Sequence, residues 1–73
     1  MTEADLNKLW NAIPVGETNA GAASAIWKRL GMYARPTIRH QLTAMADAGR
    51  IHRTSRSMPM GGEVRLFYRL PGQ

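Results

Sequence analysis

Residues 35–51 read Arg-Pro-Thr-Ile-Arg-His-Gln-Leu-Thr-Ala-Met-Ala-Asp-Ala-Gly-Arg-Ile, and within them the chain changes from a helical to an extended pattern. Pro36 suits the first turn of a helix, because its fixed φ is already helical and its missing N–H is not needed there. Apolar residues recur at helical spacing and predict one buried face: Ile38, Leu42, Met45 and Ala46. Gly49 favours the left-handed conformation that ends a helix. We therefore predict one helix between Pro36 and Gly49.

The chain after Arg50 alternates with a period of two, which is typical of a strand with one buried face. The apolar set that we expect on the buried face is Val64, Leu66, Tyr68 and Leu70. The intervening set is Arg65, Phe67 and Arg69. Residues 51–57 are the expected antiparallel partner, and Met58 to Gly62, with Pro59 and two glycines, forms the tip. This part of the chain therefore predicts a β-hairpin.

Two further helices are predicted before Arg35. The first begins after a Thr2 cap and stops at Pro14, whose ring cannot continue the hydrogen-bond ladder. Its apolar face is Leu6, Leu9, Trp10 and Ile13. The second is expected to begin at a Thr18 or Asn19 cap and to end at Gly31. Its apolar face is Ala22, Ala23, Ile26, Trp27 and Leu30. Both tryptophans lie on apolar faces, so we expect them to pack in the core.

The expected fold class is α+β: three helices followed by a two-stranded hairpin, in one domain that spans residues 1–73. The 73 residues suit a small domain, and 44% apolar content with 21% charged residues favours a folded core. The absence of cysteine excludes disulfides, thiolate nucleophiles and cysteine zinc sites. No uncharged run reaches the roughly 18 residues that cross a bilayer. The N-terminus is acidic where a secretory signal would be basic, so we expect a cytoplasmic protein.

The net charge of +5 is confined to one half of the chain. Before residue 35 three cations and three anions cancel, whereas residues 35–73 carry seven cations against Asp47 and Glu63. All seven of these cations are arginines. A guanidinium group grips phosphate or a guanine edge with two parallel hydrogen bonds. The distribution therefore indicates a nucleic-acid partner.

Three short runs carry a family resemblance: Leu30-Gly31-Met32, Arg35-Pro36-Thr37-Ile38 and Ala48-Gly49-Arg50-Ile51. With the order of elements, they resemble the winged helix-turn-helix family of small bacterial and phage transcriptional regulators, over about residues 18 to 70. The resemblance implies that the third helix enters the major groove and that the hairpin wing reaches the backbone or the minor groove. The DNA-binding residues it implies are Arg35, Thr37, Arg39, His40 and Thr43 on the helix and Arg53, Arg56 and Arg65 in the wing. One departure is that Tyr33-Ala34 stands where relatives place a capping residue.

The predicted function is sequence-specific binding of double-stranded DNA, as a small transcriptional regulator or a phage or plasmid accessory factor. No catalytic arrangement, metal site or phosphate-binding loop can be assembled from the sequence, so we expect neither an enzyme nor a cofactor. An alternative is a protein-interaction module, an inhibitor or adaptor that binds a host protein. RNA binding ranks last, because a Gly-x-x-Gly clamp and an aromatic stacking sheet are missing. A homodimer or protein partner would use the first helix, Phe67 or the wing tip with Met58 and Met60.

Overall fold

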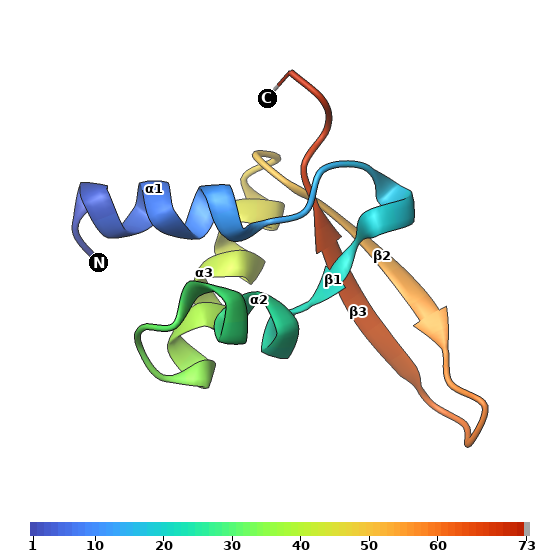
Figure 1. Ribbon diagram of the computed structural model, residues 1–73. Coiled ribbons are helices and arrows are strands. Elements are labelled where there is room, and N and C mark those ends of the chain that lie inside the picture. Colours follow the sequence, from blue (N-terminus) through green and yellow to red (C-terminus); the bar gives the residue numbers. More distant parts are fainter. Residues whose placement is uncertain (73) are drawn as a thin grey trace.

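A computed structural model describes residues 1–72 of the chain, which form three helices against a small antiparallel sheet (Figure 1). The helices are α1 (Glu3–Ala12), α2 (Ala23–Leu30) and α3 (Arg35–Asp47). A short 3-10 helix, η1 (Glu17–Asn19), follows α1. The strands are β1 (Gly21–Ala22), β2 (His52–Ser57) and β3 (Glu63–Tyr68), in the order β1-β3-β2. This arrangement is α+β and is compatible with a winged-helix fold.

The ends of the helices follow the local sequence signals. The Thr2 hydroxyl accepts a hydrogen bond from the Asp5 N–H and caps α1, as predicted. Gly31 has a φ of 75° and closes α2 in the left-handed conformation. Gly49, with a φ of 77°, lies just beyond the C-cap of α3. These three predictions are confirmed.

The predicted cap of α2 is wrong. Thr18 and Asn19 belong to η1, and the Asn19 side chain donates instead to the Val15 carbonyl at 3.0 Å. Gly21 and Ala22 then pair with Phe67 and Leu66 as the edge strand β1, so α2 begins only at Ala23. Pairing with a strand far along the chain therefore overrides the local capping signal.

The core lies where the three helices meet the sheet. Its most deeply buried side chains come from the three α-helices, the residue after α1 and the residue before β2: Leu9, Ile13, Ile26, Ile38, Leu42 and Ile51. Trp10 and Trp27 are half-buried and pack against this cluster, as expected. The predicted buried face of α3 is also confirmed, since Ile38, Leu42 and Met45 are all in the cluster. No helix within residues 1–72 is long and apolar enough to span a membrane.

The predicted buried face of β3 is only partly confirmed, because Leu66 is buried as expected but the opposite face is buried as well. Phe67 is 3% exposed and belongs to the core cluster, so it cannot serve as the partner contact expected of it. Leu66 points to the opposite face of the sheet, where it is also buried. Leu70 lies beyond the strand and is 42% exposed. One reason that both faces are buried is that β3 is the central strand of a three-stranded sheet, paired with β1 as well as β2, and not the edge of a two-stranded hairpin.

Candidate nucleic-acid interface

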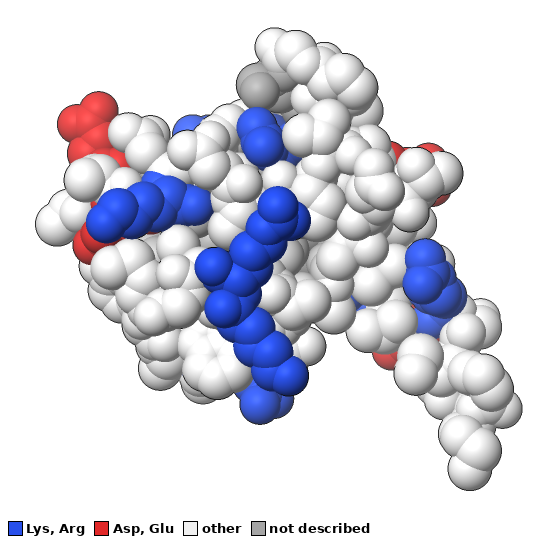
Figure 2. Space-filling model, in the orientation of Figure 1, with Lys and Arg blue, Asp and Glu red and all other residues white. Residues whose placement is uncertain are grey.

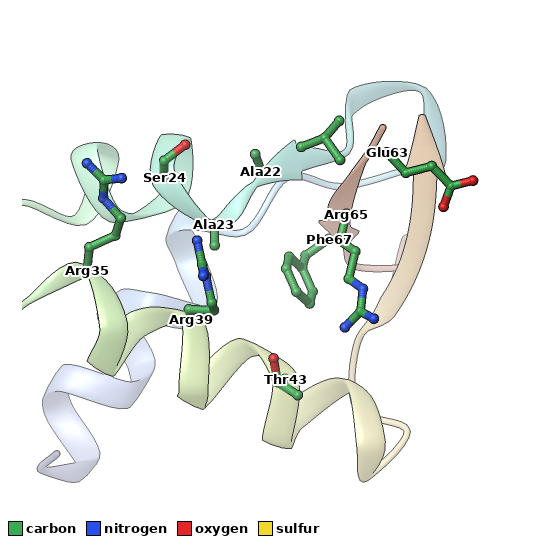
Figure 3. A pocket seen from close by; sticks show the side chains of 10 residues that line it. Ala22, Ala23, Ser24, Arg35, Arg39, Thr43, Glu63, Arg65 and Phe67 are labelled. Atoms are coloured by element: carbon green, nitrogen blue, oxygen red, sulfur yellow. The ribbon is translucent and has the colours of Figure 1, made fainter. Parts of the chain in front are cut away.

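A cleft of about 430 Å³ lies between α3, the N-terminal turn of α2 and the strand β3 (Figure 3). Its basic side chains are Arg35 and Arg39 from α3 and Arg65 from β3. Phe67 and Ala23 supply apolar surface, and Ser24 and Thr43 supply hydroxyl groups. Three arginines from two elements therefore converge on one concave surface.

Helical and strand periodicity together explain this convergence. Arg35, Arg39 and Thr43 are spaced four residues apart, so they form one stripe along α3. Arg65 lies two residues before the buried Phe67 and therefore points to the same side of the sheet. Figure 3 shows Arg65 and Phe67 directed from β3 toward α3, with Arg39 facing them across the cleft.

The cleft carries an uncompensated positive charge. Within residues 1–72, none of the arginines at positions 35, 39 and 65 makes an ion pair. Glu63 is the acidic residue that lines the cleft, and its carboxylate points away from the three arginines in Figure 3. Guanidinium groups without acidic partners favour an anionic ligand, because a bound anion offsets the repulsion between positive charges that lie close together.

The outward face of α3 carries a second, more open hollow of about 580 Å³. Its lining residues are Arg35, Pro36, Arg39, His40 and Thr43. His40 therefore lies beside the arginine stripe, on the side turned away from the core. Thr37 is exposed on α3 but lines neither hollow. Four of the five helix residues predicted to bind DNA thus share one surface.

The other two predicted hairpin arginines, Arg53 and Arg56, do not line the cleft, although Arg53 shares a separate hollow of about 230 Å³ with Arg65. Arg53 forms an ion pair of 3.0 Å with Asp47 at the end of α3. Arg56 lies opposite Val64 in the register, so it points to the outer face of the hairpin, away from α3. Arg65 alone of the three predicted hairpin residues faces the cleft.

Ser24 and Ala23 are cleft residues that sequence reasoning missed. They lie at the start of α2, which the short strand β1 brings beside β3. A two-residue strand that reads Gly-Ala has no detectable alternation, so the sequence offered no signal for this placement.

The hairpin tip is apolar and projects from the rest of the molecule. Met58 is 48% exposed and Met60 is 97% exposed. The tip is closed by hydrogen bonds between Met58 and the two glycines, Gly61 and Gly62. In Figure 2 the visible surface at the end of this projection is uncharged, whereas basic side chains cross the middle of the same face. The largest acidic group in that view lies at the N-terminal end of α1.

Comparison with known proteins gives a likeness of fold. No protein-family model and no curated protein matches the sequence. Among solved structures, the chain is similar to one described as a possible transcriptional regulator from Methanosarcina mazei Go1, with a TM-score of 0.70 and 18% identity. The match covers 94% of this chain and 56% of that protein, so the chain spans little more than half of its neighbour's length. The two proteins thus share a fold over most of this chain.

Proposed function

We propose that the protein is a winged helix-turn-helix regulator that binds double-stranded DNA with sequence preference. In this proposal α3 enters the major groove, and the β2–β3 hairpin serves as the wing, on the backbone or in the minor groove. The mechanism is docking without a chemical step. The observation that carries the proposal is the convergence of Arg35, Arg39 and Arg65, without acidic partners, on the cleft between α3 and the hairpin.

The proposal divides the work between two kinds of contact. Arg65 from the hairpin and Arg35 at the start of α3 suit phosphate groups, which set affinity and register. Arg39 and His40 lie further along α3 and suit base edges. A bidentate arginine–guanine pair contributes about 1–3 kcal/mol of discrimination.

The central test is an amide chemical-shift titration with a duplex of about 15 base pairs, first at low and then at physiological salt. We expect shifts on residues 35–43 and on the hairpin, and we expect them to weaken as salt rises. If about five phosphates are engaged, the logarithmic salt slope is about −4 to −5. A slope near zero, or the absence of shifts at low salt, would contradict DNA binding.

The assignment of Arg39 has a separate test. Arg39→Ala is expected to reduce the preference for a selected duplex over a scrambled one by about tenfold, because a base contact carries sequence information. Binding to both duplexes is measured by fluorescence anisotropy. An equal loss on both would assign Arg39 to the backbone instead.

The exposed hairpin tip favours a second candidate, a protein-interaction module. Met60 is almost fully exposed, and flexible methionines suit adaptable protein contacts. Phe67 no longer supports this candidate, because it is buried in the core. The double variant Met58→Ser/Met60→Ser tests whether the tip also contributes to DNA binding: duplex affinity stays within about twofold if it comes from phosphate contacts by the arginines.

A further inference from the structure

Tyr33, in the turn between α2 and α3, has a φ of 67°. Within residues 1–72 it is the one non-glycine residue with a positive φ. This left-handed conformation strains a side chain that has a Cβ, and it persists where surrounding contacts impose it. The contacts of Tyr33 therefore matter for how α3 begins.

Two hydrogen bonds hold Tyr33 in place. Its hydroxyl donates to the Asp5 carboxylate of α1. Its carbonyl accepts from the Trp27 indole N–H of α2 at 2.8 Å. The Tyr33 bond, followed by one with Thr2, lowers the pKa of Asp5 below its ordinary value of 3.8. The same hydroxyl–carboxylate bond raises the pKa of Tyr33 above 10.0. The turn is thus fastened to both preceding helices.

Trp27 connects this turn to α3, because it contacts both Tyr33 and Arg35. The Arg35 guanidinium carbon lies 5.4 Å from the centroid of the Trp27 ring, within range of a cation–π contact. The N-cap of α3, Ala34, forms no side-chain capping bond. Because α3 has no side-chain cap at its start, the contacts through Tyr33 and Trp27 add to the backbone bond from Ile38 N–H to the Ala34 carbonyl in holding its first turn.

We propose that Asp5 and Tyr33 are positioning residues, which orient Arg35 and the first turn of α3 toward DNA from outside the interface. The inference rests on the proposed function, because it concerns how that function is tuned. It makes DNA affinity depend on a carboxylate of α1 that does not line the cleft.

Charge and positioning predict opposite effects for Asp5→Ala. Removing an acid makes the protein more basic, which by itself tightens binding to DNA. Loss of the bond to Tyr33 instead loosens Arg35, so we expect affinity to fall about fivefold. Glu3→Ala is the matched control, because Glu3 is an exposed acid in the same first turn of α1. It is expected to leave affinity unchanged or to raise it by less than about twofold.

A double-variant cycle and a measurement without DNA complete the test. In the Arg35→Ala background, Asp5→Ala is expected to lose its effect, since the two residues act through one chain of contacts. In the free protein, Asp5→Ala and Tyr33→Phe should shift the Trp27 indole N–H and Arg35 Nε–H resonances, whereas Glu3→Ala should not. Thermal unfolding checks that each variant is folded.

The outcomes separate the inference from the proposed function. The inference is overturned if the Asp5→Ala variant binds DNA as tightly as the Glu3→Ala variant. It is also overturned if Asp5→Ala lowers DNA affinity by the same factor in the Arg35→Ala background as in the wild-type protein. If the wild-type protein binds no duplex, the proposed function fails, and the resonances alone decide the positioning role. If the Trp27 indole N–H and Arg35 Nε–H resonances do not shift in the Asp5→Ala variant, the positioning role is overturned. If they shift, it is supported.

Discussion

The two faces of the β2–β3 hairpin carry similar residue types but different structural roles. The face toward the helices bears Phe67 in the core, Arg65 in the cleft and Arg53 paired with Asp47. The outer face bears the buried Leu66, the exposed Arg56 and the pair His52–Tyr68, whose ring centroids are 5.5 Å apart. An arginine and a large apolar side chain thus occur on both faces.

The difference shows that position relative to α3 decides what a hairpin residue does. Arg65 and Arg56 are chemically identical, yet only Arg65 shares a concave surface with the arginines of α3. Phe67 and Leu66 are both buried, yet only Phe67 joins the cluster that links the helices. Four pairs of variants or single variants test whether residues on the two faces differ in their effects on stability and on duplex binding.

Phe67→Ala is expected to have the largest effect, a loss of about 3–5 kcal/mol in the free energy of unfolding, because it leaves a cavity between the sheet and the helices. Leu66→Ala, outside the described core cluster, is expected to cost about 2 kcal/mol. Urea unfolding measures both values. An equal loss for the two variants would show that the two faces of β3 contribute equally to the free energy of unfolding.

Arg65→Ala is expected to weaken duplex binding about 3- to 10-fold and to reduce the magnitude of the salt slope by about 1, since a phosphate contact is lost. Arg56→Ala should weaken all duplexes alike but by less, because it points away from the cleft. Anisotropy titrations at several salt concentrations give both slopes. A larger loss for Arg56→Ala would place DNA on the outer face.

His52→Phe is expected to raise the free energy of unfolding by about 1 kcal/mol. The Nε2 atom of His52 is buried and has no hydrogen-bond partner among the described residues, and phenylalanine keeps a ring beside Tyr68. Urea unfolding is the measurement, with His40→Phe on the exposed face of α3 as the control. A destabilised His52→Phe would indicate that the imidazole has a polar partner in solution.

Asp47→Ala is expected to have the smallest effect, below about 0.5 kcal/mol in unfolding. The ion pair with Arg53 is largely exposed, and an acid at the C-terminal end of a helix opposes the helix dipole. The same variant frees Arg53 and should tighten duplex binding by about twofold. A loss of more than 1 kcal/mol would mean that this pair fastens the hairpin to α3.

Much of the fold could be predicted because its signals are local. The Thr2 cap, Gly31, Pro36 and the apolar spacing of α3 each act within one or two helical turns. The short strand β1 could not be predicted, because its two residues are defined only by their pairing with β3. Without β1, the sequence predicts too early a start for α2 and only one of the two buried faces of β3.

The candidate site also has one part that local spacing predicts and one part that depends on tertiary contacts. The stripe of Arg35, Arg39 and Thr43 follows from helical spacing alone. The unequal roles of Arg53, Arg56 and Arg65 do not, since they depend on which face of the hairpin packs against α3. The role of Tyr33 was also hidden, because its partner Asp5 lies 28 residues earlier in the chain.

The sequence by itself determined the order of the main elements, the helix ends that carry glycine and the placement of positive charge in the second half. These features depend on local conformational preference and on composition, which need no knowledge of distant residues. Tertiary structure alone decided that both faces of β3 are buried, which arginines meet in the cleft and how α1 reaches the turn before α3. Each of these depends on contacts between residues far apart in the chain, where burial and pairing outweigh local preference.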